Sequence, residues 1–332
     1  MKVLILAPFT KHALDQLRQS YEITHESWLP DGILQDPIDL GNRLNDENFQ
    51  ALVVEGDFVL KETFELAPNL GFVGVCRGTT SQIDIQDATT HGIRIANTPG
   101  RNIHAVAEHT IGLIYALGRR IAESDSYVQS GEWSSPLGAY NTLRSTEINN
   151  KVLGIVGFGN IGHAVASLAN AIGLNVLTYD PKVLPSETER NGAIWSDLNF
   201  LLESSDFVSV HIGNQAPDDP LFDAEILSKM KRSAFLINTS TPDAVDHHAL
   251  AAAVKQRQIS GAALDVHPTH PLEPNSPLLG LSNVILTPHI AGATEETIER
   301  HSEMMVENLL AFASNEEIPF LVNPAVLEIV SE

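Results

Sequence analysis

Three glycines in the segment VLGIVGFGNIGHAVA have the spacing of a dinucleotide-binding turn. Gly157, Gly159 and Gly162 follow an apolar run that predicts a strand, and they open a pattern that predicts a helix. The first glycine of such a turn permits the tight bend, the second lets the backbone approach a pyrophosphate, and the third lets helix and strand pack closely. The start of the helix, with Asn160 and Ile161, would face the anion. We interpret the segment as a cofactor-binding turn.

A carboxylate follows the next predicted strand, NVLTYD, about 20 residues beyond the glycines. At this position Asp180 would accept a hydrogen bond from a ribose 2′-hydroxyl and would repel a 2′-phosphate. The sequence therefore predicts NAD as the cofactor, although Lys182 leaves some room for NADP. The alternative is a glycine-rich turn with an Asp that merely caps a helix.

Several polar residues stand at the ends of later predicted strands. His289 lies in ILTPHIAGAT, His211 and Ile212 end VSVHI, and Asp265 closes GAALD. Taken singly, each is more often a structural residue than a functional one. Together they fall at the carboxyl ends of strands in one predicted doubly wound domain, where ligands bind. Asp265 could accept a hydrogen bond from a nicotinamide amide, or it could cap the loop that follows it.

Two further segments carry candidate residues. The loop LINTSTPDAVD has an apolar start and then a run of hydroxyl residues that includes Thr239 and Thr241, with no basic residue. The segment DVHPTHP contains His267 and His270 between prolines. A metal pair is one interpretation of these histidines, but no convincing third ligand accompanies them, so we predict no metal site.

The elements that would position these residues alternate between strand and helix along the whole chain. Apolar runs at 3–6, 51–56 and 72–76 predict buried parallel strands, with helical patterns between them. A second series of six strands begins at residue 151, and a final helix covers 295–313. Residues 105–125 predict one long apolar helix that packs between domains or subunits. We expect an α/β nucleotide-binding domain inserted into a first α/β domain, to which the C-terminus returns.

Composition narrows the class of protein. Of 332 residues, 20 are Lys or Arg and 42 are Asp or Glu, which gives a formal charge of −22. Nucleic acids and anionic membranes both attract basic surfaces, so neither is an expected partner. Cys76 is the only cysteine and lies among apolar residues, which indicates a buried thiol. No run reaches the roughly 18 apolar residues of a membrane span, and we predict a cytoplasmic protein.

With these motifs in fixed order, the chain resembles the NAD-dependent D-isomer-specific 2-hydroxyacid dehydrogenases over nearly its whole length. The resemblance implies a flavodoxin-like substrate domain formed by residues 1–102 and 294–332. It also implies a Rossmann NAD-binding domain at 103–293, and a homodimer joined through a helix and arm at about 103–150. The segments that carry the likeness are HGIRIANTPGRN, AVAEHTIGL, KVLGIVGFGNIG, SDFVSVH, LINTSTPDAVD, GAALDV and NVILTPHIAGAT.

The family mechanism implies an Arg that holds the substrate, a His that exchanges the proton and a Glu that orients the His. His289 matches the His. In the pattern I-N-x-x-R-G-x-x-V-D, Thr241 stands where the Arg belongs, and His270 stands where the Glu of D-V-x-x-x-E-P-L belongs. A neutral His270 could accept a hydrogen bond from His289 and orient it. Without the Glu, the imidazolium form of His289 would be less favoured than in typical relatives.

The missing cation could come from the first domain. The resemblance places Arg77, Gly78 and Thr79 in the loop that offers backbone amides to the substrate. Arg77 is the first candidate for the cation and Arg101 is the second. The alternative role for Arg77 is a structural salt bridge across the cleft.

These observations support one leading function and two alternatives. The leading hypothesis is an NAD-dependent oxidoreductase that transfers a hydride between NAD(H) and a small hydroxy or keto substrate, with altered substrate recognition. Because two of three catalytic positions differ, a catalytically impaired NAD-binding sensor or scaffold is the main alternative. A redox-neutral reaction that uses bound NAD is the third hypothesis, and no residue singles it out.

Overall fold

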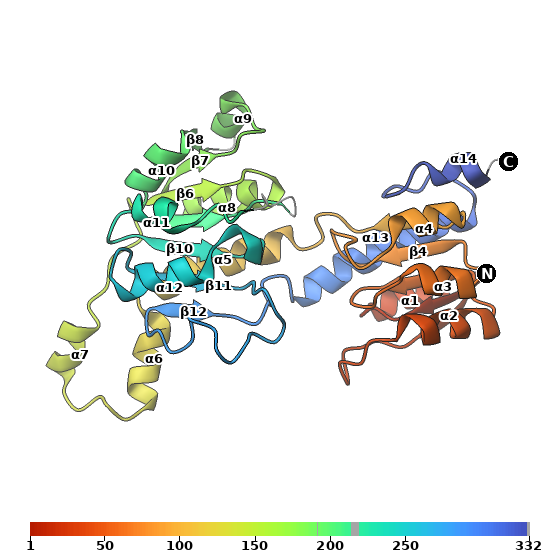
Figure 1. The fold of residues 1–332 in the computed structure, drawn as a ribbon, viewed down its shortest axis with the longest axis horizontal. Helices are drawn as coiled ribbons and strands as arrows, with labels where there is room; N and C mark the ends of the chain where they lie inside the picture. The colour runs from red at the N-terminus through yellow and green to blue at the C-terminus, as the bar shows by residue number, and fades with distance from the viewer. Residues whose placement is uncertain (191, 214–218, 331–332) are drawn as a thin grey trace. The chain divides into compact units, whose positions relative to one another are not determined.

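The computed structural model describes residues 1–190, 192–213 and 219–330, and the chain divides into two compact units (Figure 1). Unit 1 consists of Met1–Arg101 and Thr294–Glu332, and unit 2 consists of Asn102–Ala293. Both chain ends therefore belong to unit 1, and unit 2 is one continuous stretch of sequence. Each unit is built on a parallel sheet with helices on both faces, which confirms the predicted α/β fold class.

The sheet of unit 1 has five parallel strands in the order β2-β1-β3-β4-β5. This is the flavodoxin-like order, in which ligands bind beyond the carboxyl ends of the strands. The apolar runs that predicted β1, β3 and β4 are completely buried at their centres, as parallel strands require. The strands are β1 (Lys2–Ile5), β2 (Glu22–His25), β3 (Ala51–Val54), β4 (Phe72–Val75) and β5 (Arg94–Asn97).

Two layers of helices cover this sheet because successive strand side chains point to opposite faces. Val3 and Ile5 pack with α1 (Lys11–Leu17) and α13 (Glu295–Ala313). Leu4 packs on the other face, against α2, α3 and α4. These helices are α2 (Pro37–Asp46), α3 (Lys61–Leu66) and α4 (Ile85–Thr90), and a short α14 (Val326–Val330) follows α13.

The C-terminal segment completes unit 1. Met305 and Leu309 of α13 are buried in the same core as β1. Beyond α13, Leu321 forms an antiparallel bridge with Ala96 of β5. The buried side chain of Asn323 accepts a hydrogen bond from the Ile95 N–H at 2.8 Å. These contacts join the C-terminal segment to β1 and β5 of unit 1.

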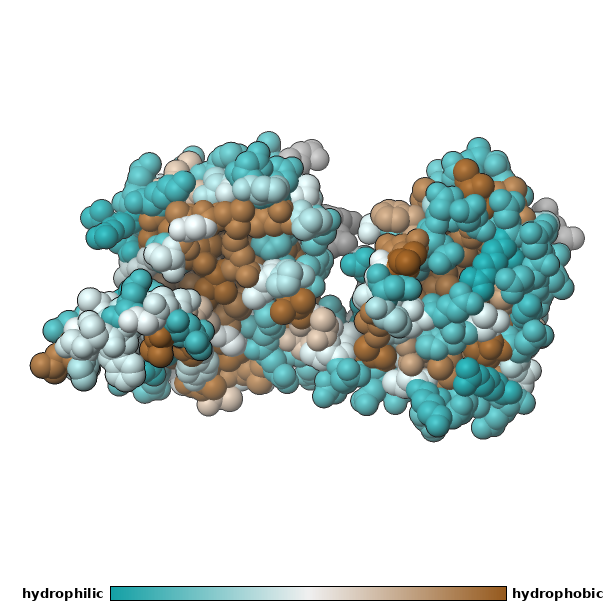
Figure 2. Space-filling view, turned by 90° about the horizontal axis from the view of Figure 1, so that it is seen from below, coloured by the Kyte–Doolittle hydropathy of each residue, from teal (hydrophilic) through white to brown (hydrophobic). Residues whose placement is uncertain are grey.

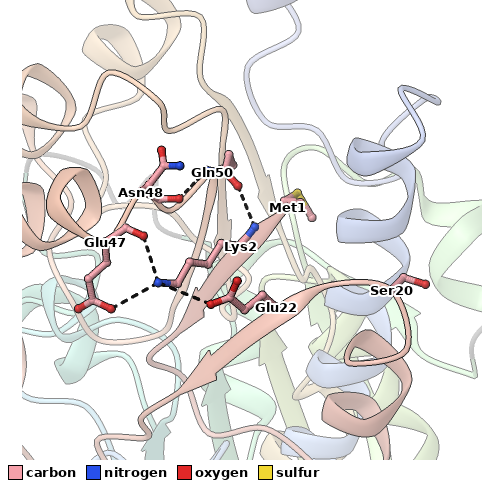
Figure 3. Close-up of a pocket in the computed structure, with 7 residues that line it drawn as sticks. All are labelled: Met1, Lys2, Ser20, Glu22, Glu47, Asn48 and Gln50. Atoms are coloured by element: carbon pink, nitrogen blue, oxygen red, sulfur yellow. Dashed lines mark hydrogen bonds and ion pairs between the residues drawn. The ribbon is translucent and has the colours of Figure 1, made fainter.

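The amino-terminal end of β1 lies beside a surface cavity of about 440 Å³ (Figure 3). The Lys2 ammonium there lies 3.7 Å from a carboxylate oxygen of Glu22 and 3.7 Å from one of Glu47. It also donates to the Glu47 carbonyl oxygen at 3.1 Å, and the Lys2 N–H donates to the Gln50 side chain at 2.8 Å. Because the Lys2 charge is paired with two carboxylates, we interpret these contacts as structural contacts that hold β1 and β2 in place.

A buried carboxylate beyond β3 predicts a measurable pH effect. Asp57 is 1% exposed; its Oδ1 accepts the Gln35 N–H at 2.9 Å, and Oδ2 has no partner among the described residues. Burial raises the pKa of Asp57, so the folded state holds this proton more tightly than the unfolded state does. Stability then falls as pH rises through the raised pKa. We expect Asp57→Asn to stabilise the protein by about 1 kcal/mol at pH 7.

Thermal unfolding of Asp57→Asn and of the unchanged protein at several pH values tests this effect. The gain should shrink toward pH 4, because both states of the unchanged protein are then increasingly protonated. Asp36→Asn serves as the control, since Asp36 is an exposed helix cap. An equal gain at every pH would contradict the assignment of the effect to Asp57.

The sheet of unit 2 has seven parallel strands in the order β12-β11-β10-β9-β6-β7-β8. The chain leaves β6 toward β7 on one side and continues from β9 on the other, so the strand order reverses between β6 and β9. Ligands of doubly wound sheets bind at such a switch point. The strands are β6 (Val152–Val156), β7 (Asn175–Tyr179), β8 (Ile194–Trp195), β9 (Phe207–Val210), β10 (Phe235–Asn238), β11 (Gly261–Leu264) and β12 (Val284–Leu286).

Helices again form a layer on each face of this sheet. One core includes α5 and α8, and the other includes α10, α11 and α12. The described residues contain no helix that is long and apolar enough to cross a lipid bilayer. The helices are α5 (Ile103–Gly118), α8 (Asn160–Ala171), α9 (Pro185–Arg190), α10 (Leu198–Ser204), α11 (Ala224–Ser228) and α12 (His247–Lys255).

The prediction of one continuous helix at 105–125 is wrong. The helix ends at Gly118, and a second helix, α6 (Ile121–Gln129), begins after Arg120, whose φ is +52°. The Arg120 side chain fixes this break because it binds both carboxylate oxygens of Glu123 and the Thr142 carbonyl oxygen. A further helix, α7 (Pro136–Thr142), follows. Together α6 and α7 form an arm that projects from unit 2 (Figure 1).

Candidate active site

The glycine turn lies between β6 and α8, at the switch point of the unit 2 sheet. Gly157 has a φ of +93°, and a Cβ there would lie 2.5 Å from the carbonyl oxygen of His211. A Cβ on Gly162 would lie 2.5 Å from the carbonyl oxygen of Gly157. Both positions therefore require glycine for packing within the protein. A Cβ on Gly159, in contrast, would meet no protein atom within 4 Å in the described part of the chain.

Beyond Gly159 the helix α8 begins without a side-chain cap on its first turn, as far as the described residues show. The N–H groups of Asn160 and Ile161 therefore have no side-chain acceptor there. An uncapped helix start beside an open glycine is the arrangement that holds a pyrophosphate. The residues present thus fit the dinucleotide that the motif predicts.

Asp180 directly follows β7 and contacts the turn. Its Oδ2 accepts the Phe158 N–H at 2.7 Å, and its Oδ1 accepts the Lys182 N–H at 2.8 Å. A carboxylate has about four lone-pair sites, so each oxygen can accept one more hydrogen bond. Asp180 can therefore fix the turn and still receive ribose hydroxyls.

His211 borders the same turn from the end of β9. Its ring is almost completely buried, and burial lowers its pKa to about 4, so the ring is neutral at pH 7. Nε2 pairs with the Ser209 hydroxyl at 2.8 Å, whereas Nδ1 has no partner among the described residues. The backbone of His211 closes over Gly157, and Ile212 follows it at the rim.

The loop after β10 is organised by one buried amide. The Asn238 Nδ2 donates to the Thr241 carbonyl oxygen at 2.8 Å, and its Oδ1 accepts the N–H and the hydroxyl of Ser240 at 3.1 Å each. Thr239 pairs through its hydroxyl with Thr110 of α5 at 3.1 Å. Thr241 is 7% exposed and leads into a short 3-10 helix, η1 (Pro242–Ala244). The backbone at Thr241 is therefore held in one conformation.

Asp265 holds the loop that carries His289. This carboxylate is completely buried after β11. Its Oδ1 accepts the Thr287 hydroxyl at 2.6 Å and the Ile290 N–H at 2.9 Å, and its Oδ2 accepts the Ala291 N–H at 2.8 Å. Two roles were considered for Asp265, and these hydrogen bonds are those of a loop cap. These bonds flank His289 on both sides.

His289 itself has a left-handed backbone, with a φ of +58°. This conformation costs a non-glycine residue about 1–2 kcal/mol and therefore has to be imposed by its surroundings. His267 contributes to this support because its Nε2 donates to the Thr287 carbonyl oxygen at 2.9 Å. Strained residues of this kind concentrate at functional sites.

The two candidate histidines are paired. Nδ1 of His289 lies 2.9 Å from Nε2 of His270, and the ring centroids are 5.0 Å apart. Either ring can donate in this pair, depending on the tautomers. Both rings are exposed, so both can exchange protons with solvent or a ligand. In the described part of the chain, no group of three or more His, Cys, Asp or Glu side chains is placed to hold a metal ion.

Sequence reasoning did not single out two residues that touch this site. His109 of α5 lies 3.7 Å from Asp265 and 3.3 Å from the Thr287 hydroxyl. Thr287 bonds Asp265 and links it to β12. His109 lies within the segment AVAEHTIGL and Thr287 within NVILTPHIAGAT, so both stand in segments that carry the family likeness.

Unit 1 contains the predicted substrate loop after β4. Arg77 and Gly78 accept hydrogen bonds through their carbonyl oxygens, from the Thr98 N–H and from Asn97, at 3.0 Å each. Within the described residues of unit 1, the guanidinium of Arg77 has no ion pair or hydrogen bond. Burial lowers the pKa of Arg77, and the nearby charge of Arg101 lowers it further. Thr79 follows, half-buried.

Arg101 differs from Arg77 because its charge is already paired. Its Nη1 lies 2.5 Å from a carboxylate oxygen of Glu55 and 2.6 Å from Nδ1 of His301. Of the two candidates for a substrate-binding cation, only Arg77 is unpaired within the described part of unit 1.

A glycine turn fitted to a dinucleotide and a strained histidine at the strand ends define the class of an NAD-dependent oxidoreductase. A family model described as "D-isomer specific 2-hydroxyacid dehydrogenase, NAD binding domain" matches residues 111–291. The chain therefore belongs to the D-isomer specific 2-hydroxyacid dehydrogenase family, and its cofactor is NAD.

Individual relatives support this membership. A glyoxylate reductase of Thermofilum pendens is 41% identical over 82% of this chain and 80% of its own length. One of Thermococcus litoralis is 37% identical over 98% of both chains. Among solved structures, the TT0316 protein of Thermus thermophilus has a TM-score of 0.84 and 33% identity, and the match covers 97% of this chain and all of that one.

The fit of the cofactor predicts opposite outcomes for two neighbouring glycines. Gly159→Ala should fold normally, because its Cβ meets no protein atom, but should weaken NADH binding about tenfold or more. Gly157→Ala should lower the melting temperature as well, because its Cβ would meet the His211 backbone at a positive φ. Thermal unfolding of the protein without cofactor and fluorescence titration with NADH measure both effects. Unchanged NADH affinity in Gly159→Ala would contradict the cofactor placement.

Proposed function

We propose that this protein reduces a 2-oxo acid to the 2-hydroxy acid with NADH, and that His289 donates the proton. The observation that carries the proposal is the hydrogen bond between His289 and His270. His289 lies on the loop that Asp265 holds. NADH, when bound, supplies the hydride that the carbonyl carbon receives. The names of the relatives, which are glyoxylate reductases, support a small 2-oxo acid as the substrate class.

The pair provides a way to hold the proton. If Nδ1 of His289 donates to a neutral His270, the other nitrogen of His289 is directed away from the pair and can carry the proton that the alkoxide takes. His270 is then a positioning residue that fixes the ring through an acceptor nitrogen. Two charged rings at 2.9 Å would repel each other, so the pair holds one positive charge at most.

The substrate carboxylate needs a cation, and position 241 does not provide one. Thr241 is nearly buried and offers a neutral hydroxyl, whereas an Arg would offer a charged, bidentate fork. We assign the substrate's negative charge to Arg77, whose guanidinium has no partner within the described part of unit 1. Gly78 and Thr79 would offer the backbone of the same loop. Thr241 would contact the substrate through its hydroxyl.

A panel of carbonyl compounds tests this function. The absorbance of NADH is followed with glyoxylate, pyruvate and hydroxypyruvate, and with hydroxyacetone as an uncharged analogue. We expect turnover of the acids and little or none of hydroxyacetone. Arg77→Met should raise KM for glyoxylate about tenfold or more, since a charge-assisted bond is lost. Arg18→Met is the matched control, because Arg18 is exposed just after α1 and pairs only weakly with Asp15.

The same experiment separates the proposal from its main alternative. An NAD-binding sensor or scaffold would bind NADH in the fluorescence titration and would turn over none of these compounds. That outcome would contradict the reductase and favour the sensor. Retained KM in Arg77→Met, with normal turnover, would instead show that another group holds the carboxylate.

The proposal includes a homodimer, formed through the arm and located in the cytoplasm. No described residue of α6 or α7 is buried, and the arm carries exposed apolar side chains. Figure 2 shows apolar side chains gathered on the body of unit 2 beside the projecting arm, as expected for a face that a second copy covers. Sedimentation velocity of Leu137→Glu against the unchanged protein tests the dimer. The exposed apolar residues of the arm are Ile121, Val128, Trp133, Leu137 and Tyr140.

A further inference from the structure

Three charged residues stand just beyond neighbouring strands of the unit 1 sheet. Glu55 directly follows β3, Arg77 lies two residues beyond β4, and Arg101 follows β5. The strands are adjacent in the order β3-β4-β5 and parallel, so their carboxyl ends meet at one edge of the sheet. Two guanidinium groups and the Glu55 carboxylate therefore stand beyond three adjacent strands, and the strand that bears Arg77 is the middle one.

Glu55 binds only one of the two cations. Its carboxylate lies 2.5 Å from Nη1 of Arg101, and both side chains are largely buried, at 15% and 12% exposed. A pair this buried is weakly screened by solvent, so Glu55 cancels most of the charge of Arg101. Arg77 has no such partner within the described residues of unit 1.

His301 adds no charge to this group. Its ring is completely buried, and Nε2 lies 2.7 Å from the carbonyl oxygen of Pro8. Since a carbonyl oxygen can only accept, Nε2 carries a hydrogen and donates. Nδ1 lies 2.6 Å from the guanidinium of Arg101, which can only donate, so Nδ1 is the acceptor and carries no proton. The ring is therefore a neutral tautomer.

The sum of these charges leaves one positive charge, on Arg77. We propose that Glu55 is a specificity-determining residue: by pairing with Arg101 it leaves a single unpaired cation at this edge, so the site accepts a substrate with one negative charge and discriminates against a dianion. This inference rests on the proposed function, in which Arg77 faces the substrate carboxylate.

A dianion would bring a second negative charge close to Glu55 without a cation to receive it. Removing the Glu55 charge releases Arg101 to serve as that cation. The discrimination should then move toward the dianion by about tenfold, since charges a few ångströms apart in a partly buried site interact strongly. Binding of a monoanion should change less than binding of a dianion, because Arg77 itself is retained and Glu55 acts on it only through space.

Oxamate and oxalate provide a matched pair of probes. They have nearly the same shape, but oxamate carries one negative charge and oxalate carries two. Their dissociation constants are measured by calorimetry with the protein saturated in NADH. We expect the unchanged protein to bind oxamate more tightly, and Glu55→Gln to shift the oxalate-to-oxamate affinity ratio about tenfold toward oxalate.

Two further variants separate charge from structure. Glu55→Asp keeps the carboxylate and should keep the original ratio, although its shorter side chain alters packing. Glu62→Gln removes an exposed carboxylate from α3 in the same unit and should leave the ratio unchanged. A ratio that shifts equally in Glu55→Asp and Glu55→Gln would reflect distortion and would overturn the proposal.

The outcomes also distinguish this inference from the function on which it rests. If glyoxylate is turned over but oxalate binds as well as oxamate in the unchanged protein, the assignment to Glu55 is wrong and the reductase stands. An unchanged ratio in Glu55→Gln has the same meaning. If no 2-oxo acid is turned over and neither probe binds, the proposed function fails and the inference fails with it.

Discussion

His289→Ala is expected to lower kcat by about 10²–10⁴ on every 2-oxo acid that the protein reduces, because the alkoxide then has no positioned proton donor. NADH affinity should stay within about twofold, since the contacts of the glycine turn come from other elements. Stability should change little, because the ring of His289 is exposed and alanine at a φ of +58° keeps a Cβ and therefore a similar backbone strain. Steady-state kinetics with glyoxylate and NADH titration measure the two effects.

Two further variants make this test more specific. His248→Ala removes an exposed histidine of α12 in the same unit and should leave kcat unchanged. His270→Glu places a carboxylate beside the ring of His289, where it would favour the protonated form. Reduction by that variant should therefore continue to higher pH than in the unchanged protein. Equal losses in His289→Ala and His248→Ala would contradict a specific role for His289.

Asp265→Ala is expected to lower both stability and kcat. The substitution leaves two backbone N–H groups and the Thr287 hydroxyl without their acceptor inside the protein. Each unsatisfied buried donor costs about 1–3 kcal/mol, so the free energy of unfolding should fall by roughly 3 kcal/mol or more. The loop would then no longer impose the left-handed backbone of His289, and kcat should fall with it.

Thermal unfolding without cofactor separates the two roles considered for Asp265. A loop cap acts in the absence of NADH, so the melting temperature of the cofactor-free protein should fall. A residue that acted only through the nicotinamide amide would weaken NADH binding and leave that temperature unchanged. Asp246→Ala serves as the comparison, because it removes a helix cap with two hydrogen bonds at the start of α12. Its loss should lower the free energy of unfolding by about 1 kcal/mol.

Local signals in the sequence predicted much of the fold and part of the site. The glycine turn and the buried strands β3, β4 and β6 follow from residues that are neighbours in sequence, so one segment is enough to recognise them. Strands β2, β5 and β8 escaped prediction because they are partly exposed edge strands with no long apolar run. The helix break at Arg120 was not predicted because the apolar pattern continues across it. The contact that fixes the break is made with Thr142, which lies on another helix.

The electrostatics of the site depended on residues far apart in the sequence. The sequence predicted Arg77 as the first candidate to hold an anion and Arg101 as the second, but it did not indicate which of the two charges is paired. The difference between them comes from Glu55 and from His301, which lies 200 residues from Arg101. No local pattern indicates which of two arginines finds a carboxylate, because that choice is made by the packing of three strand ends and a helix.

The split composition of unit 1 has a consequence for the order in which the chain folds during synthesis. Residues 102–293 form a continuous unit and can complete their core as soon as they leave the ribosome. The first hundred residues cannot do so, because their sheet lacks the buried side chains of Met305 and Leu309 and the Asn323 bonds that close β5. The face of the N-terminal sheet on which α13 packs must therefore stay partly uncovered until that helix has been synthesised. The unit that is made first is thus completed last, and during that interval its apolar strands are the part of the protein most exposed to aggregation.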